Sequence, residues 1–153
     1  MPKNLDSNLR FGFLIHDVSR MRRIVVDRAL KPLGITRSQW WVLAFLSRRD
    51  GMTQTALAAD LDLTKVAIGG LVDRMEGGGF VERRADERDA RARRIYLTKA
   101  GQKLVATIRE AVDAVEADIM SVVEDEELEG ASGVLLKVKT RLIELIGSDA
   151  EGA

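Results

Sequence analysis

The side chains with the clearest chemical potential are arginines gathered in one short stretch of the chain. A guanidinium group offers several N–H donors in one plane, a geometry that suits phosphate oxygens. The formal net charge of the chain is +0, so the overall composition hides a local basic surface of this kind. The acidic residues crowd elsewhere, between Glu110 and Glu129. The arginines of the cluster are Arg83, Arg84, Arg88, Arg91, Arg93 and Arg94.

Side chains for catalysis or metal binding are scarce. The chain has no cysteine and a single histidine, His16, which removes thiolate chemistry, disulfides and histidine clusters. No nucleophile elbow or phosphate loop is present, so we expect neither an enzyme nor a protein with a metal or cofactor. Residues 1–10 lack the apolar core of a signal peptide, and no apolar run approaches the ~20 residues of a membrane span. We therefore expect a soluble, cytoplasmic protein.

These arginines must be positioned by a mainly helical fold. With 153 residues, 46% of them hydrophobic, the chain suits one globular unit or a tightly coupled pair. Apolar residues at three- and four-residue spacing predict helices near residues 7–30, 36–50, 53–61, 64–76, 104–122 and 128–145. The short helices 53–61 and 64–76 are joined by Asp62 and Leu63, which makes them a helix-turn-helix candidate.

A β-hairpin is expected directly after this helix pair. Residues 80–84 and 94–98 alternate in strand fashion, and residues 85–93 between them have no apolar side chain larger than alanine. The hairpin therefore has a long tip that carries arginines. The predicted fold class is mainly α with a small β-hairpin wing, in which a winged helix-turn-helix lobe is combined with helical regions at the two chain ends.

The charged tip contains a spaced pattern that is more specific than its composition. The residues follow the order D-x-x-D-x-R-x-x-x-I-x-L-T-x-x-G, and this pattern resembles the wing signature of MarR-type regulators. Residues further upstream, from Thr36 and Trp40 to Arg83, are similar to the same family in order. The resemblance covers roughly residues 9–145. The signature positions are Asp86, Asp89, Arg91, Ile95, Leu97, Thr98 and Gly101.

The resemblance implies an organisation and a function. In this family the terminal helices of two protomers form a dimerisation domain, and two winged lobes bind DNA. Residues 1–34 and 101–147 would then dimerise, residues 35–100 would form the DNA-binding lobe, and residues 148–153 would be a disordered tail. The expected protein is a ligand-responsive transcriptional regulator, a repressor, that binds pseudo-palindromic duplex DNA as a homodimer. An architectural or adaptor protein without a small-molecule ligand stays open as the alternative.

The apolar seams of the terminal helices favour a homodimer on their own terms. So small a lobe cannot easily bury both seams, and a second copy is the simplest cover. The alternative is that the two seams pack on each other within one chain. The seam of the last helix consists of Leu128, Ala131, Leu135, Val138, Leu142 and Leu145.

The DNA-binding residues are expected on the second helix of the pair, at the start of the first, and on the wing. We expect Arg91 to enter a minor groove, Asp89 to orient it or a neighbouring arginine, and Arg93 and Arg94 to lie near phosphates. Arg83 and Arg84 would meet phosphates or solvent. The alternative is a solvated hairpin. The candidates are Thr53, Gln54, Thr64, Lys65, Val66, Ala67, Gly69, Gly70, Asp73, Arg74, Arg84, Asp89, Arg91, Arg93 and Arg94.

The expected outward face of the second helix offers few hydrogen-bonding groups. Val66 and Ala67 could contact thymine methyl groups, and Gly69 and Gly70 would let the helix approach the groove closely. Each interior glycine costs ~1 kcal/mol of helix stability relative to alanine. The alternative is that these glycines relieve crowding against a neighbouring helix.

A ligand cleft is implied by the resemblance alone. MarR-type proteins often bind phenolic or aromatic carboxylates, or acyl-CoA thioesters of them, where the dimer helices meet the DNA-binding lobe. Such an effector would release the DNA. The alternative is that the aromatic residues belong to the core and that His16 is structural. The ligand candidates are His16, Arg20, Arg23, Trp40, Trp41 and Phe45.

Overall fold

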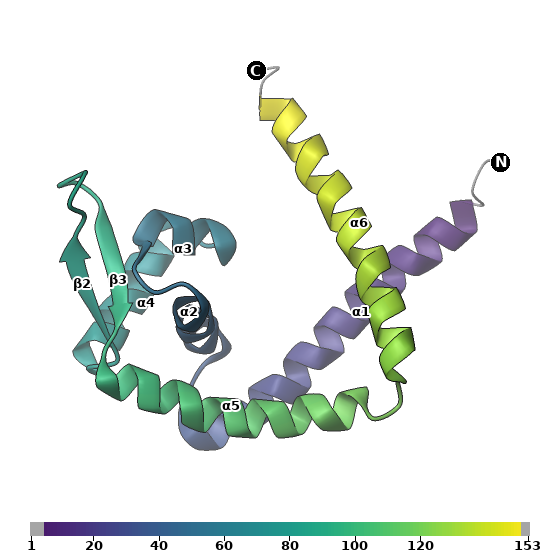
Figure 1. Cartoon of the computed structure of the whole chain (residues 1–153), viewed down its shortest axis with the longest axis horizontal. Helices are drawn as coiled ribbons and strands as arrows, with labels where there is room; N and C mark the ends of the chain where they lie inside the picture. The colour runs from purple at the N-terminus through teal and green to yellow at the C-terminus, as the bar shows by residue number, and fades with distance from the viewer. Residues whose placement is uncertain (1–4, 151–153) are drawn as a thin grey trace. The chain divides into compact units, whose positions relative to one another are not determined.

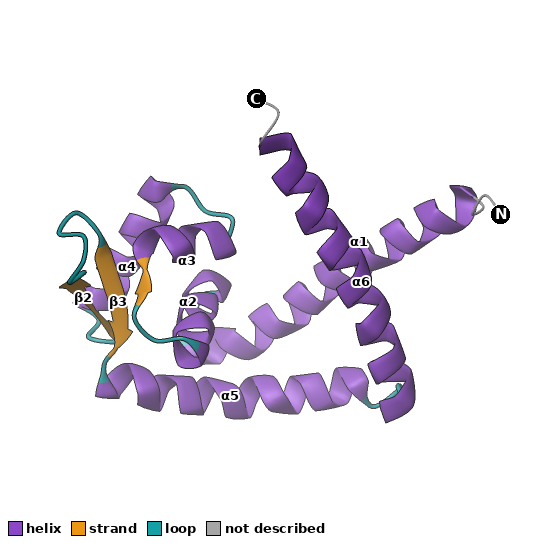
Figure 2. Ribbon diagram, turned by 45° about the horizontal axis from the view of Figure 1, so that its top comes forward, coloured by secondary structure: helices purple, strands orange, loops and turns teal. Residues whose placement is uncertain are grey.

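The computed structural model of the chain describes residues 5–150 and divides the chain into two compact units, Met1–Val115 and Glu116–Ala153. Helices predominate, with one small sheet in the first unit (Figures 1 and 2). The helices are α1 (Leu5–Leu30), the 3-10 turn η1 (Lys31–Leu33), α2 (Arg37–Arg48), α3 (Gln54–Asp60), α4 (Lys65–Gly77), α5 (Lys99–Met120) and α6 (Asp125–Ala150). The strands are β1 (Met52–Thr53), β2 (Val81–Ala85) and β3 (Arg93–Leu97).

Three threonines set the starts of the central helices. Thr36 caps α2, where its hydroxyl accepts from the main-chain N–H of Gln39 and the Gln39 side chain accepts from that of Thr36. Thr53 and Thr64 cap α3 and α4 in the same way, through hydroxyls that accept a main-chain N–H three residues on. Such caps satisfy donors that have no partner inside the helix. The predicted helix-turn-helix is confirmed, with residues 61–64 between its helices.

The sheet contains a strand that the sequence analysis did not predict. The order is β1-β3-β2, with both pairs antiparallel, and the short β1 lies beside β3 in Figure 2. The predicted hairpin is confirmed, with Arg83 opposite Ile95 and Arg84 opposite Arg94. Two residues carry no readable alternation, so β1 forms only because β3 offers it a partner.

The core of the first unit lies between the helix-turn-helix, the sheet and α5. It takes Trp40, Val42, Leu43 and Leu46 from α2, Ile68, Leu71, Val72 and Met75 from α4, and Val105, Ile108 and Val112 from α5. Met52, Val81 and Ile95 close it from the three strands. The last turns of α1 add Val26 and Leu30, so α1 packs with the lobe in this unit.

Gly79 and Gly101 join the wing to the helices on either side of it. Gly79 has a φ of 79°, a left-handed conformation that suits glycine and turns the chain from α4 into β2. Gly101 lies so close to Phe80 that a Cβ there would collide with the Phe80 carbonyl oxygen. Thr98 joins the two, since its hydroxyl donates to the carbonyl of Gly79 at 2.6 Å and accepts from the N–H of Gly101. The last two residues of the wing signature therefore fix the base of the hairpin.

The second unit holds the end of α5 and all of α6. The helix α6 continues to Ala150, three residues into the segment 148–153 that the sequence predicted as a disordered tail. No proline follows Gly147, and a single glycine does not end a helix of this length. Residues 151–153 lie outside the described part of the chain. The assignment of residues 1–34 and 101–147 to dimerisation stays a prediction.

Candidate nucleic-acid interface

The outward face of α4 has the composition expected from the sequence. Ile68, Leu71, Val72 and Met75 are buried, whereas Val66 is 86% exposed. Thr64, Lys65, Ala67, Asp73 and Arg74 are exposed as well. The first turns of a recognition helix are the part that reaches base edges in helix-turn-helix proteins. Here that part presents one cation, one exposed valine and little hydrogen-bonding capacity.

The two interior glycines of α4, Gly69 and Gly70, are not required by packing. A Cβ built on Gly69 would lie 3.6 Å from Nε2 of Gln54, and one on Gly70 would lie 3.5 Å from a terminal nitrogen of Arg74. Both are ordinary van der Waals contacts, and both are with the far ends of flexible side chains. Crowding against a neighbouring helix, the alternative left open by the sequence, therefore does not explain either glycine. Close approach of DNA to α4 at these glycines stays a prediction.

Arg83 lies at the centre of an interaction network that joins β2 to α3 and α4. Its Nε donates to Oε1 of Gln54 at 3.1 Å, and its guanidinium donates to the carbonyl of Gly69 at 3.1 Å. The guanidinium also pairs with Asp73 at 2.6 Å and with Glu76 at 3.1 Å. Glu76 in turn accepts from the main-chain N–H of Arg83 at 2.8 Å. The expectation that Arg83 meets phosphates or solvent is therefore wrong, because internal acceptors already hold its guanidinium.

A second network orders the tip of the wing around Asp86. This side chain is 6% exposed, and its carboxylate accepts the main-chain N–H groups of Arg88 at 2.7 Å and of Asp89 at 3.1 Å. It also pairs with Nε of Arg94, and Nη1 of Arg94 donates to the carbonyl of Gly51 at 2.8 Å. These donors, first the N–H of Arg88, then Arg94, then the N–H of Asp89, hold the pKa of Asp86 below its usual 3.8. The tip is an ordered turn that Arg94 ties to the residue before β1.

The arginines of the wing therefore differ in what they can offer. Arg94 is held by Asp86 and Gly51 while 40% of its side chain stays exposed, and its expected place near phosphates stays a prediction. Arg84 lies 4.4 Å from the centre of the Tyr96 ring and pairs with Glu82. Arg93 makes one long hydrogen bond, 3.4 Å, to the carbonyl of Ala90.

Arg91, which belongs to the wing signature, is with Arg88 one of two wing arginines whose guanidinium groups have no partner among residues 5–150. Its side chain is exposed, and it has no hydrogen bond or ion pair with any residue between 5 and 150. Asp89 accepts the main-chain N–H of Arg91 at 3.0 Å, so Asp89 fixes the backbone from which this arginine projects. A free guanidinium on an ordered turn can enter a groove without first breaking an internal bond.

The sequence reasoning missed the roles of Arg83 and Asp86. Arg83 shares a face of β2 with the buried Val81, two residues before it, and this alternation could have indicated that its side chain points inward. Asp86 stands first in the wing signature, but nothing in the sequence distinguished it from the exposed Asp89. Both residues act through partners that the sheet and the helix pair bring together.

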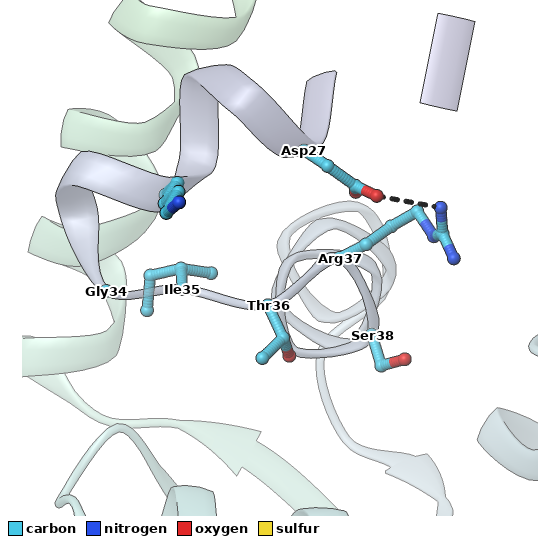
Figure 3. Close-up of a pocket in the computed structure, with 7 residues that line it drawn as sticks. Asp27, Gly34, Ile35, Thr36, Arg37 and Ser38 are labelled. Atoms are coloured by element: carbon cyan, nitrogen blue, oxygen red, sulfur yellow. Dashed lines mark hydrogen bonds and ion pairs between the residues drawn. The ribbon is translucent and has the colours of Figure 1, made fainter. Parts of the chain in front are cut away.

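The six ligand candidates differ in their exposure and surroundings among the described residues. Trp40 is buried in the core, while Trp41 is 42% exposed and packs its ring 6.0 Å from that of Phe45. His16, Arg20 and Arg23 are exposed on α1. A cavity of about 510 Å³ lies at the α1–α2 connection, where Asp27 pairs with Arg37 (Figure 3), and none of the six lines it. The ligand-binding role of these residues stays a prediction.

Within residues 5–150, no group of three or more histidine, cysteine, aspartate or glutamate side chains is arranged to hold a metal ion. No helix in the same range is long and apolar enough to cross a membrane.

Comparisons with known proteins agree with the fold and with the wing signature. The model of the MarR family matches residues 33–92. A MarR family transcriptional regulator from Rhodococcus sp. RHA1 is 28% identical, with a TM-score of 0.76 over 89% of this chain and 95% of that one. MepR of S. aureus, in a DNA complex, is 28% identical, with a TM-score of 0.73 over 86% and 97%. A MarR mutant of E. coli complexed with operator DNA is 25% identical, with a TM-score of 0.76 over 89% and 99%.

Proposed function

We propose, from the premise that this chain belongs to the MarR family, that it is a ligand-responsive repressor of transcription. It binds a pseudo-palindromic operator in duplex DNA as a homodimer. A small aromatic or phenolic acid, or the acyl-CoA thioester of one, binds the dimer and releases the DNA. The observation that carries the DNA-binding part is the ordered wing tip, on which Arg91 is exposed and unpaired among the described residues while Asp86 and Asp89 fix its backbone.

The division of work between helix and wing follows from the chemistry of their side chains. In the DNA-bound state α4 lies in the major groove, where Lys65 and Thr64 are its exposed polar side chains near the N-terminus. Arg91 inserts into the adjacent minor groove, whose negative potential is strongest where A·T pairs narrow it. Because α4 offers few donors, the wing supplies a large share of the affinity. MepR of S. aureus and the MarR mutant of E. coli, which have a similar fold, form complexes with DNA and with operator DNA, which supports this proposal.

The homodimer is supported by exposed apolar side chains on both terminal helices, α1 and α6. On α1 these include Phe13 and Leu14, 69% and 62% exposed, and on α6 they include Leu136 and Ile146, 63% and 70% exposed. Isolated exposed apolar residues are normal on a protein surface, whereas continuous helical faces of them mark an interface. A second copy of the chain covers such faces with symmetric contacts. The two wings of the resulting dimer then match two half-sites in the DNA.

The effector part of the proposal rests on side chains of suitable chemistry. Trp41 and Phe45 offer exposed or partly exposed rings, and Arg20 and Arg23 are cations on α1 that could pair with a carboxylate. Effector and operator then bind with opposite preferences. Such coupling is typically ~1 to 3 kcal/mol, and it acts equally in both directions.

The proposal is tested by selecting DNA with the purified full chain. Duplexes from a random pool are captured, sequenced, and titrated with the protein at several salt concentrations. We expect an enriched sequence with two related half-sites and an affinity that falls steeply with salt, because each phosphate contact releases counterions. A pool that remains random after selection, or binding that does not depend on salt, would remove the DNA-binding function.

A further inference from the structure

We infer that Arg83 is a positioning residue that presents the side-chain amide of Gln54 to the DNA backbone. The inference rests on the proposed DNA-binding function and gives this arginine and this glutamine separate roles within it. Gln54 contacts a phosphate, and Arg83 acts through Gln54 without touching DNA. The basis is the guanidinium network that joins the wing strand β2 to the starts of α3 and α4.

The inward direction of Arg83 follows from the register of the hairpin. Arg83 lies opposite the buried Ile95 and two residues after the buried Val81. Its side chain therefore projects from the face of β2 that packs on the helices. Only 20% of that side chain is exposed. Asp73 and Glu76 compensate its charge at 2.6 and 3.1 Å. A guanidinium with these partners is not available to a phosphate.

The contact with Arg83 settles how the amide of Gln54 is turned. Arginine carries donors only, so the atom of Gln54 that meets Nε of Arg83 at 3.1 Å must be the acceptor Oε1. The two N–H groups on Nε2 are then left for another acceptor. Nε2 lies 3.6 Å from the position a Cβ would take on Gly69, so the amide reaches the partly exposed glycine step of α4.

A phosphate oxygen is the acceptor that this arrangement fits. Both N–H groups on Nε2 of Gln54 lack a hydrogen-bond partner among the described residues, so a phosphate oxygen that approaches can accept from them. Phosphate contacts of this kind set the orientation of a DNA-binding lobe without reading sequence. Because Arg83 of β2 holds Gln54, the contact between Gln54 and the phosphate is also linked to the strand that leads into the wing.

The inference is tested by a double-mutant cycle on the selected operator with Arg83→Lys, Gln54→Ala and the combined variant. Lysine keeps the charge that pairs with Asp73 and Glu76 but lacks the fork that also holds Gln54. We expect each single change to weaken operator binding roughly tenfold, because a charged acceptor loses one donor. We expect the combined variant to bind no worse than either single one, since both remove the same contact. Arg109→Lys is the matched control, because Arg109 also donates to a neutral side chain, Ser47, but lies outside the interface.

The possible outcomes separate the two claims. Single effects that multiply in the combined variant, or an affinity that Arg83→Lys leaves unchanged, overturn the positioning role while the DNA-binding function stands. A wild-type chain that selects no duplex at all overturns both. If Arg83→Lys melts below the assay temperature, the side-chain amide resonances of Gln54 in the wild-type protein decide. A shift of these resonances on operator binding supports the inference, and unchanged resonances overturn it.

Discussion

Replacing Arg91 by alanine is the most direct test of how the wing contributes to binding. The side chain has no hydrogen bond or ion pair with any described residue, so its loss breaks no internal contact. The main-chain contact to Asp89 is kept, because alanine retains the N–H group. We therefore expect an unchanged melting temperature together with weaker DNA binding. This separation of stability from affinity would not occur for Arg94, whose guanidinium is part of the fold.

The size of the effect follows from the contact that is removed. A specific arginine contact in a groove is worth about 1 to 3 kcal/mol, which corresponds to roughly a five- to hundredfold loss of affinity for each wing. The preference for A·T-rich flanks should fall with it, because minor-groove width sets the strength of this contact. Fluorescence anisotropy on the selected operator, with flanks rich in A·T or in G·C, measures both quantities at fixed salt.

Lys65→Ala provides the matched comparison on the recognition helix. The side chains of Lys65 and Arg91 are both exposed cations. Lys65 is the first residue of α4, the helix that we propose to lie in the major groove. Its loss should weaken binding on both kinds of flank alike and reduce the salt dependence by about one phosphate contact. If Lys65→Ala abolishes binding while Arg91→Ala leaves affinity and flank preference intact, the division of work between helix and wing is refuted.

Four further experiments test other parts of the structure. Asp86→Asn should lower the melting temperature at neutral pH. Because the folded-state pKa of Asp86 lies below its unfolded value, the higher melting temperature of the wild type should approach that of the variant as the pH falls below 3.8. A difference in melting temperature that stays constant across that range would contradict the network around Asp86. Gly69→Ala and Gly70→Ala should each stabilise α4 by up to ~1 kcal/mol in denaturant unfolding, since a Cβ fits at both positions, and a loss of stability would show hidden crowding. Leu135→Glu combined with Leu142→Glu should give monomer or aggregate in sedimentation at micromolar concentration, and a folded wild-type monomer would rule out the homodimer. Titration with aromatic acids and their thioesters should show weaker ligand binding when operator DNA is present, and tight binding that DNA leaves unchanged would exclude the proposed release.

The sequence by itself determined the elements and their order. Each central helix is predicted by the spacing of its apolar residues and by a threonine at its start. These features lie within a few residues of one another in the sequence. The inward residues of α4 and the two main strands of the wing could be predicted for the same reason. The wing signature added the family resemblance, because its aspartates, arginine, threonine and glycine have fixed spacing. All of these are local properties of the chain.

The tertiary structure decided which charged residues are available to DNA. Arg83 and Arg91 look alike in the sequence, yet Arg83 is engaged by Gln54, 29 residues away, and by carboxylates of α4. Arg94 is engaged by the carbonyl of Gly51, 43 residues away, as well as by Asp86. Whether a guanidinium is free depends on acceptors that only the packed sheet and helices bring within 3 to 4 Å, since a hydrogen bond weakens steeply beyond that range. The spacing of residues along the chain does not predict which distant acceptors an arginine meets.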